Sequence, residues 1–457
     1  MRIRIIFAVF ICKITRFLLR GLKRGGTALP GKIAVKVCPD VLKHLARDVE
    51  CIAITGTNGK TTSARMLEQF FIDAGESFFS NKSGSNLMQG ITAEFIQNST
   101  AAGNLKRKYA IIECDEAASK KVFEYLDPKI LLITNVFSDQ LGLIGGVKET
   151  LENIKIGVQN SPNAVVCLNA DDPLISSIAE DVPNRIVFFG VEKGVFKDAA
   201  DELSDATQCV RCAAAGYEYD YTTYGHLGGF CCPSCGYTRK SPDVAVTELI
   251  SRDVDSQTVR IRTGGGLIDV TINIPGGYNI YNAAGAIAAA IEMGFSLDAA
   301  KDAMLRFECG FGRMEKFVLD SLHVRMILVK NPAGCNQVLN YLRAVPGDAL
   351  FVVCLNDHIA DGTDVSWIWD ARFEKLLDMG DRLHGVLVSG TRADDMAQRL
   401  KAAGLSDERV RVFNDYGELL DAMLGQDAPV YVMPSYTAML ELRGVICRRF
   451  GIKEYWE

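Results

Sequence analysis

One short segment constrains the fold of this chain more than any other. The run Thr55-Gly56-Thr57-Asn58-Gly59-Lys60-Thr61-Thr62 follows a short apolar stretch and leads into residues 61–74, whose apolar spacing is helical. A glycine loop between a strand and a helix cradles phosphate, because backbone N–H groups and the helix N-terminus face the anion. Lys60 can neutralise phosphate charge and the Thr61 hydroxyl can hold Mg²⁺. Although Ile54 replaces the usual first glycine, this context predicts an ATP site.

Apolar segments alternate with amphipathic ones on both sides of this loop. In the first series, strands are expected at residues 51–55, 109–114, 130–136, 164–169 and 185–190. The stretch 204–242 breaks the alternation, and extended segments (245–251, 258–263) and a helical run (281–293) follow it. A second series begins near residue 323, with strands at 324–329, 350–355, 385–389, 410–413 and 430–433 and helices at 336–343, 373–379, 394–403, 416–424 and 437–450. This alternation predicts an α/β fold with mostly parallel sheets.

The patterns divide the chain into three parts. Residues 1–46 form an N-terminal basic amphipathic segment, 47–310 an ATP-binding domain and 311–457 a second, Rossmann-like α/β domain. A cysteine-rich insertion occupies about 205–242 of the first domain, and the link between the domains is expected near 309–317. A length of 457 residues and a hydrophobic content of 48% provide enough apolar material for two such cores.

The first 20 residues resemble a signal peptide only superficially. Their apolar core, residues 5–12, is short, and Lys13, Arg16 and Arg20 follow it without a small-residue cleavage site. The segment is interpreted as a basic amphipathic helix that either packs on the main body or lies on an anionic inner leaflet. No apolar run approaches the ~20 residues needed to span a bilayer.

Two CxxC pairs indicate a metal site in the insertion. Cys209 and Cys212 are separated by 19 residues from Cys232 and Cys235, a spacing typical of a Cys₄ zinc ribbon. Cys231 breaks that spacing. Four thiolates leave no open position for water, so a structural role for Zn²⁺ is expected. The other cysteines mostly stand singly in apolar runs, as free thiols do in a reducing cytoplasm.

The charge balance argues against nucleic acid as a partner. Fifty Lys and Arg against 56 Asp and Glu give a net charge of −6, whereas phosphate contacts need a basic surplus. The insertion is not basic either, so its tyrosines are expected to pack a small core rather than to stack on bases: Tyr217, Tyr219, Tyr221 and Tyr224. A zinc-ribbon nucleic-acid-binding ATPase stays as an alternative, which nucleic-acid-stimulated ATP hydrolysis would favour.

A carboxylate near the phosphate loop is a candidate magnesium ligand. Glu113 ends the strand expected at 109–114, and the carboxyl end of a strand beside a phosphate loop is where such a ligand belongs. Asp115 and Glu116 follow closely, so a neighbouring acid or a solvated turn are the alternatives. Glu113 is the predicted ligand.

The phosphate loop resembles the ATP loop of the Mur ligases, which add amino acids to peptidoglycan precursors. Further matches follow in the same order: Thr134-Asn135, Asp139-Gln140-Leu141, Leu168-Asn169-Ala170-Asp171-Asp172-Pro173, Gly277-Tyr278-Asn279-Ile280-Tyr281-Asn282-Ala283-Ala284 and Gly312-Arg313-Met314-Glu315. The resemblance implies a Mur ligase central ATPase domain in which Asn279 and Asn282 lie in the segment that contacts adenine. It also implies that Arg313 reaches the phosphates.

The chain departs from ordinary Mur ligases in a consistent way. It lacks the N-terminal substrate domain, has Gln140 in place of a histidine, shows no ribose-binding aspartate at 327–332 and carries the cysteine cluster. With all of these departures, the chain resembles one subfamily, the MurT subunits of lipid II isoglutaminyl synthase. Further segments also match it, although 141–146 is less polar than expected: 330–334, 356–370, 389–393 and 434–440.

This resemblance implies a reaction in peptidoglycan biosynthesis. The α-carboxyl of D-glutamate in the lipid II stem peptide is activated by ATP to an acyl phosphate, and ammonia converts it to D-isoglutamine. The chain has no GxCxG nucleophile elbow, and its five histidines stand in no glutaminase context. The resemblance supplies the missing part as a separate GatD-type glutaminase. A stand-alone Mur or folylpolyglutamate-type amino-acid ligase is the alternative.

The resemblance also suggests that this subunit lends a carboxylate to the partner's catalytic histidine. In a triad the acid fixes the imidazole tautomer and stabilises its charge. Asp357 is the first choice because it follows the strand expected at 350–355, and Asp361 and Asp364 are the alternatives. Each of these acids could instead cap a turn, since the segment is rich in turn formers.

Overall fold

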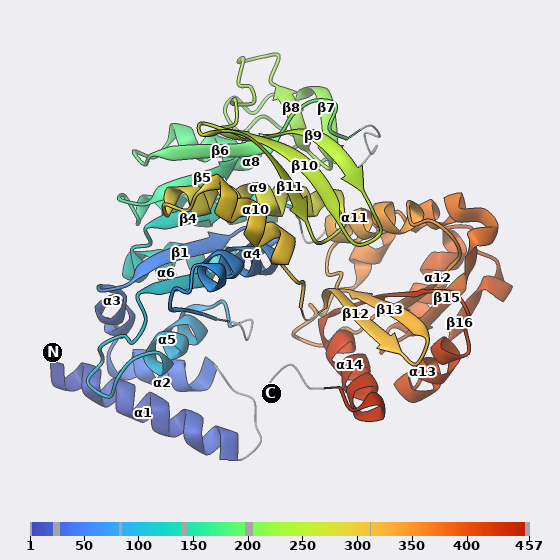
Figure 1. Ribbon diagram of the computed structural model, residues 1–457, viewed down its shortest axis with the longest axis horizontal. Coiled ribbons are helices and arrows are strands. Elements are labelled where there is room, and N and C mark those ends of the chain that lie inside the picture. Colours follow the sequence, from blue (N-terminus) through green and yellow to red (C-terminus); the bar gives the residue numbers. More distant parts are fainter. Residues whose placement is uncertain are drawn as a thin grey trace. The chain divides into compact units, whose positions relative to one another are not determined.

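The computed structural model describes residues 2–21, 28–81, 85–138, 144–196, 204–310 and 312–452 (Figure 1). The chain forms two compact units. The first comprises Met1–Phe137, Gly145–Asn273 and Tyr278–Phe307, and the second comprises Ser138–Ile144, Ile274–Gly277 and Glu308–Glu457. Each unit is built on its own, mainly parallel sheet.

A nine-stranded sheet forms the centre of the first unit, in the order β11-β10-β9-β6-β5-β4-β1-β3-β2. The first six strands and β9 are parallel, whereas β10 and β11 continue the sheet antiparallel. Their bounds are β1 Glu50–Thr55, β2 Phe78–Ser80, β3 Tyr109–Glu113, β4 Ile130–Ile133, β5 Val165–Asn169, β6 Ile186–Val191, β9 Val244–Arg252, β10 Gln257–Thr263 and β11 Gly266–Ile272. The central strands β1, β3 and β4 are apolar and buried, as strands covered on both faces must be.

Helices surround this sheet and connect its strands. They are α3 Val41–Ala46, α4 Lys60–Asp73, α5 Met88–Gln97, α6 Glu116–Leu126, α7 Ile144–Gln159, α8 Pro173–Ser176, the 3₁₀ turn Ser177–Glu180, α9 Gly277–Glu292 and α10 Leu297–Arg306. Asp115 caps α6 and Asp172 caps α8, each by accepting two backbone N–H groups. The short strand β2 and the polar-faced β11 were not predicted, because three residues or a glycine-rich hairpin carry little periodic signal.

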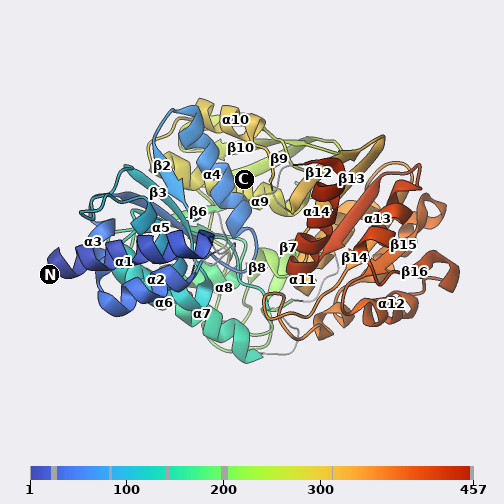
Figure 2. The same cartoon turned by 90° about the horizontal axis from the view of Figure 1, so that it is seen from below.

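The N-terminal segment consists of α1 Arg2–Gly21 and α2 Ala28–Val37. Helix α1 lies along α2 and α5 in both views (Figures 1 and 2). Its buried face, formed by Ile5, Ala8, Val9 and Cys12, belongs to the same core as the sheet residues Ala53 and Ala110. The expected amphipathic helix is therefore present and packs on the main body. Among the described helices, none combines the length and apolarity that a bilayer crossing requires.

The cysteine-rich insertion contains a two-stranded hairpin, β7 Glu218–Tyr224 and β8 Leu227–Cys231. It has a small core of its own, in which Cys209, Cys232, Phe230 and Tyr237 are buried. Tyr217 and Tyr219 pack against that core, as expected. The other two tyrosines do not, because the Tyr221 hydroxyl donates to the Val191 carbonyl and the Tyr224 ring stacks on Phe137.

The second unit contains a six-stranded sheet in the order β12-β13-β17-β14-β15-β16, parallel apart from the β12–β13 pair. Its strands are β12 Arg313–Leu319, β13 Leu322–Ile327, β14 Ala349–Cys354, β15 Leu383–Ser389, β16 Val410–Val412 and β17 Val430–Pro434. Its helices are α11 Pro332–Arg343, α12 Ala393–Ala402, α13 Tyr416–Leu424 and α14 Tyr436–Phe450, with 3₁₀ turns at Ser366–Trp369, Phe373–Arg382 and Asp407–Arg409. The helix expected at 373–379 is thus 3₁₀ rather than α, and Gly380 (φ +57°) interrupts it.

Candidate active site

The loop between β1 and α4 requires glycine at two positions. Gly56 has φ +122° and Gly59 has φ +89°, both in the region that side chains disfavour. A Cβ atom on Gly59 would lie 2.1 Å from Asn282 Oδ1, and one on Gly56 would lie 2.4 Å from Thr134 Oγ1. The loop therefore passes too close to α9 and to the segment after β4 for any larger residue.

Thr134 and Asn135, which follow β4, hold the loop in shape. Asn135 accepts the Thr57 N–H through its carbonyl oxygen at 2.8 Å and the Asn58 N–H through Oδ1 at 3.0 Å. The Thr134 hydroxyl donates to the Asn58 carbonyl at 2.7 Å. Since these two loop N–H groups bind Asn135, the N–H groups that could face an anion are those at the N-terminus of α4, which have no intrahelical acceptor.

Lys60 is the first residue of α4 and is only 6% exposed. Its ammonium donates to the Gly56 carbonyl at 2.5 Å and forms an ion pair with Glu116 Oε1 at 2.6 Å. Burial by itself would lower the pKa of Lys60, but Glu116 and Glu113 outweigh it and raise that pKa above its usual value. The amine therefore stays charged. The sequence does not single out Glu116, because its only distinguishing feature there is the acidic run that it shares with Glu113.

Glu113 and Thr61 lie side by side at the edge of this loop. The Thr61 hydroxyl donates to Glu113 Oε2 at 2.9 Å. Asn81 fixes the backbone of Glu113, accepting its N–H at 2.9 Å and donating to its carbonyl at 2.7 Å. A hydroxyl and a carboxylate oxygen at this separation form a donor set that fits Mg²⁺.

The other residues that the sequence predicts to bind the nucleotide lie on different elements. Asn279 and Asn282 share a face of α9, where Asn282 donates to Asn279 Oδ1 at 3.0 Å, and Asn282 also contacts Gly59. Arg313 begins β12 in the second unit, so its reach to a nucleotide stays a prediction. The Asp139-Gln140-Leu141 motif and the first half of the run 141–146 lie outside the described residues.

A buried polar network connects the nine-stranded sheet of the first unit to the cysteine-rich insertion. Asp171, fully buried, accepts from Arg239 Nε at 2.7 Å, the Tyr281 hydroxyl at 2.6 Å and the Val191 N–H at 2.9 Å. Burial raises the pKa of Asp171 even though Arg239 opposes the shift. The Asp171-Asp172 motif has no evident role in the sequence, and the structure shows that Asp171 anchors the insertion.

A second contact leads from the insertion to the phosphate loop. The Phe137 ring stacks on Tyr224 and lies 4.6 Å from the ring of His226, centroid to centroid. The Phe137 N–H donates to Thr57 Oγ1 at 3.0 Å, and the Thr57 hydroxyl in turn lies 3.2 Å from the Phe137 carbonyl. The packing of the hairpin therefore supports a residue of the phosphate loop.

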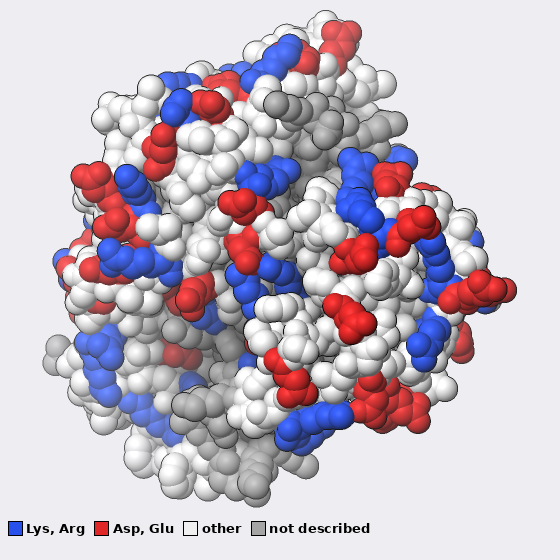
Figure 3. Space-filling view, turned by 45° about the vertical axis from the view of Figure 1, so that its right-hand side comes forward, with Lys and Arg blue, Asp and Glu red and all other residues white. Residues whose placement is uncertain are grey.

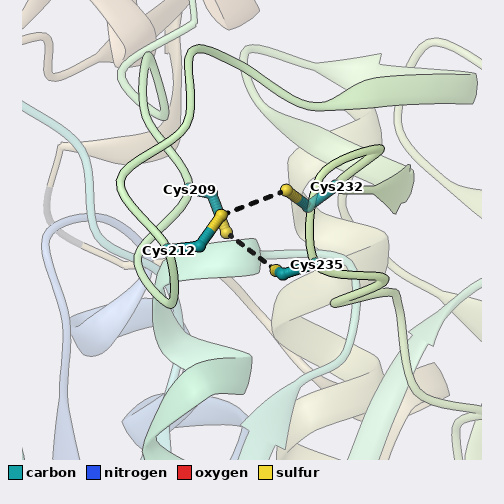
Figure 4. Close-up of side chains that lie close together, drawn as sticks. All are labelled: Cys209, Cys212, Cys232 and Cys235. Atoms are coloured by element: carbon teal, nitrogen blue, oxygen red, sulfur yellow. Dashed lines mark hydrogen bonds between the residues drawn. The ribbon is translucent and has the colours of Figure 1, made fainter.

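The four expected cysteines converge in the insertion (Figure 4). Their sulfur atoms all lie within 4.8 Å of one another, with Cys209–Cys235 at 3.7 Å and Cys212–Cys232 at 3.6 Å. Four thiolates at Zn–S bonds of ~2.3 Å would have sulfurs about 3.8 Å apart, so this set can hold a tetrahedral metal ion. Cys231 is exposed and does not belong to the cluster.

The environment of Cys209 also suits metal ligation. Burial would raise the pKa of its thiol, but backbone N–H groups of Cys212 and Arg211 and the neighbouring cysteines lower it to about 7. N–H groups that stabilise a thiolate are what a ligand turn needs, because the metal binds the deprotonated sulfur.

The loop after β14 distinguishes the three acids proposed for the split triad. Asp361 accepts the Thr437 N–H at 2.7 Å and the Thr437 hydroxyl at 2.5 Å, so it caps the start of α14. Asp364 accepts the Ser366 N–H at 2.8 Å within its own turn. Both acids thus act as caps. Asp357 instead accepts from the Thr391 hydroxyl at 2.9 Å and lies 3.5 Å from the Arg392 guanidinium, with 31% of its side chain exposed.

Charged side chains on the face shown in Figure 3 alternate in sign. Lys and Arg stand among Asp and Glu, and neither sign forms a continuous field over the described residues visible there. A single-sign basic groove is the usual footprint of nucleic-acid binding. This face therefore offers no support for the nucleic-acid alternative.

Two family models match the chain: "Mur ligase middle domain" over residues 54–230 and "MurT ligase C-terminal" over residues 328–439. A similar relative is the "Lipid II isoglutaminyl synthase (glutamine-hydrolyzing) subunit MurT" of Streptococcus pneumoniae (strain ATCC BAA-255 / R6), 32% identical over 438 residues, 95% of each chain. The protein of the same name from Staphylococcus aureus (strain N315) is also 32% identical, over 97% of this chain and 98% of its own. The chain belongs to the MurT family. The resemblance stated from the motifs is thereby confirmed.

Solved structures confirm the fold class expected for a MurT protein. A pseudomurein peptide ligase type C from Methanothermus fervidus is 20% identical, with a TM-score of 0.66 over 90% of this chain and 81% of its own. MurF from Acinetobacter baumannii has the same TM-score at 16% identity, over 90% and 80% of the two chains. At these identities the likeness shows the Mur ligase fold alone.

Proposed function

We propose that this chain is the ligase subunit of a glutamine-dependent amidotransferase acting on lipid II. It would use ATP to convert the α-carboxyl of D-glutamate in the stem peptide to D-isoglutamine, as one step of peptidoglycan biosynthesis. The relatives that share 32% identity with it over almost the whole chain are named as subunits of such a synthase. The phosphate loop carries the proposal, because its buried Lys60 and the Thr61–Glu113 pair are the parts that phosphoryl transfer requires.

The chemistry divides into two steps at this site. The carboxylate of the substrate attacks the γ-phosphorus of ATP, giving an acyl phosphate and ADP; ammonia then attacks the acyl carbon and expels phosphate. Lys60 would offset negative charge on the transferred group, and Mg²⁺ held by Thr61 and Glu113 would supply further charge neutralisation. The proposed nucleotide and magnesium residues are Gly56, Thr57, Asn58, Gly59, Lys60, Thr61, Thr62, Glu113, Asn279, Asn282 and Arg313.

Ammonia would come from a separate glutaminase of the GatD type. Outside the four-cysteine cluster, every cysteine except Cys231 and Cys309 is buried. Burial raises the pKa of the Cys114, Cys335 and Cys354 thiols, among others, so these groups are poor nucleophiles. This supports a partner that carries the catalytic cysteine and histidine, with Asp357 as the acid that orients that histidine.

The cysteine cluster would hold a structural Zn²⁺ ion. Its four sulfur ligands complete a tetrahedral shell without an open position, so the ion would stabilise the insertion rather than take part in the reaction. We also propose that the protein works in the cytoplasm, at the inner face of the membrane, where a lipid-linked substrate would be presented.

A reconstituted assay with three nitrogen sources tests this function. Lipid II, ATP and Mg²⁺ are incubated with the chain alone or with its glutaminase partner, and the amidated stem peptide is measured by mass spectrometry. We expect amidation with glutamine only in the complex, and amidation with high ammonium by the chain alone. Ligation of a free amino acid by the isolated chain, without amidation, would instead identify a stand-alone amino-acid ligase.

A further inference from the structure

Helix α1 carries apolar side chains on two opposite faces. One face is buried in the core of the first unit, as described above. Of the 19 large apolar side chains that are exposed in the described part of the chain, seven lie on this one helix: Ile3, Ile6, Phe7, Phe10, Ile14, Phe17 and Leu18. Their spacing of three and four residues places them in a single stripe along the helix, directed away from the core.

Two polar contacts with α5 and the residues after it help to fix the rotation of α1 and so the direction of the stripe. The Lys13 ammonium donates to the Ser99 carbonyl at 2.5 Å, and Arg16 lies 3.7 Å from Glu94 on α5. All three aromatic residues in the stripe are more than half exposed, Phe7 at 54%, Phe10 at 58% and Phe17 at 78%. A soluble surface rarely keeps so large a contiguous apolar area, which usually marks an interaction site.

The charge around the stripe selects the kind of partner. The first 39 residues contain nine Lys and Arg and no Asp or Glu, whereas the rest of the chain has 41 Lys and Arg against 56 Asp and Glu. Arg4 on α1 and Lys32 and Lys36 on α2 are exposed. A basic, apolar-faced helix that is too charged to span a bilayer has the composition of helices that lie in the membrane interface.

We propose that α1 docks on the surface of an anionic bilayer, with the stripe inserted among the acyl chains and the basic residues at the headgroups. A second copy of the chain is a poorer occupant, because two such helices would bring positive charges together with no acidic residue in the segment to pair them. The inference stands on α1 and α2 alone, and only its last readout rests on the proposed function.

Vesicle co-sedimentation of the full chain tests the docking. The probes are vesicles of phosphatidylcholine alone and of phosphatidylcholine with about one third phosphatidylglycerol. We expect binding to the anionic vesicles, weakened by salt, and a loss of about a hundredfold in the Phe7→Ser/Phe10→Ser/Phe17→Ser variant. The matched control is Leu267→Ser/Leu305→Ser/Val318→Ser, whose three positions are 65%, 53% and 62% exposed elsewhere. It should bind like the wild type.

A charge variant and a mass measurement complete the test. Arg4→Gln/Lys32→Gln/Lys36→Gln should weaken binding to anionic vesicles about tenfold or more and leave binding to neutral vesicles unchanged. Equal melting temperatures show that the variants are folded. Failure of the wild type to bind anionic vesicles, or equal binding by the stripe variant, overturns the proposal. So does a wild-type dimer in light scattering that the stripe variant loses, because the stripe is then an interface between two copies.

Amidation assays separate this proposal from the proposed function. With the partner present, the stripe variant should amidate detergent-dispersed lipid II at the wild-type rate and lipid II embedded in anionic vesicles at least tenfold more slowly. Equal rates on vesicles overturn the docking and leave the amidation function intact. Absence of wild-type activity on the dispersed substrate contradicts the proposed function, and the vesicle-binding result still decides the docking.

Discussion

The loops that follow β1 and β14 occupy equivalent places in their two sheets and have opposite character. Each extends from the carboxyl end of a parallel strand, where α/β folds place their binding sites. The loop after β1 is enclosed: its lysine is 6% exposed, and neighbouring segments bind its backbone. The loop after β14 is open, with the Asp357 side chain 31% exposed and the apolar side chain of Ile359 94% exposed. The first suits a small anion, and the second suits a protein partner.

Loss of the Lys60 charge in the closed loop, the enclosed loop after β1, should have the largest effect on the amidation rate. Lys60→Ala removes the cation that would offset phosphoryl charge, so amidation should fall about a thousandfold with glutamine and with ammonium alike. The measurement is the initial rate with each nitrogen donor. Lys129→Ala is the control, since Lys129 only pairs with Glu50 at the surface and should leave the rate within about twofold. A folded Lys60→Ala protein with normal turnover would show that the loop does not bind ATP.

A change in the open loop, the loop after β14, should slow amidation with only one of the two nitrogen donors, glutamine. Asp357→Asn keeps the shape but removes the charge that would stabilise the partner's imidazolium, so glutamine-dependent amidation should fall by about 10²–10⁴-fold. High ammonium should restore the product, and ATP binding and complex formation should persist. Asp364→Asn is the matched control, because Asp364 caps its own turn and should leave glutamine use nearly unchanged. If Asp357→Asn hydrolyses glutamine normally in the complex, the assignment is wrong.

The insertion provides a test of how far the closed loop depends on its surroundings. Cys232→Ser, or removal of the metal by a chelator, should lower the free energy of unfolding of the first unit by at least about 3 kcal/mol. The hairpin that packs on Phe137 would also loosen, so ATP affinity should fall modestly while the open loop keeps its partner. Calorimetry and nucleotide titration measure the two effects. Cys231→Ser is the control, because Cys231 lies outside the cluster. Zinc-free wild-type protein with full stability would refute the structural role.

The smallest expected effect concerns the orientation of Asp357. Thr391→Val removes the hydroxyl that donates to Asp357 at 2.9 Å. The loss of one such hydrogen bond, about 1 kcal/mol, should slow glutamine-dependent amidation about fivefold and leave the ammonium-dependent rate unchanged. A drop in both rates would place Thr391 at the ligation step instead.

The local sequence was sufficient to predict those features that depend on backbone geometry over a few residues. The glycine loop, most parallel strands and the four-cysteine cluster were predicted at the right residues, because φ/ψ demands, apolar runs and CxxC spacing act over a few residues. The 3₁₀ segment Phe373–Arg382 is an exception, since its helical spacing does not distinguish the two helix types.

Only the tertiary structure decided which side chains meet across long separations. Glu116 reaches Lys60 from 56 positions away, and Asn135 binds the phosphate loop from 77 positions away. The three acids after β14 look alike in sequence, and only the packing shows that Asp361 binds Thr437 at the start of α14 whereas Asp357 binds Thr391. Likewise, the sequence by itself determined that α1 is amphipathic and basic, whereas packing decided which of its apolar faces is buried. The physical reason is that periodicity specifies the angle around a helix or strand, but contacts between distant segments depend on how those elements pack.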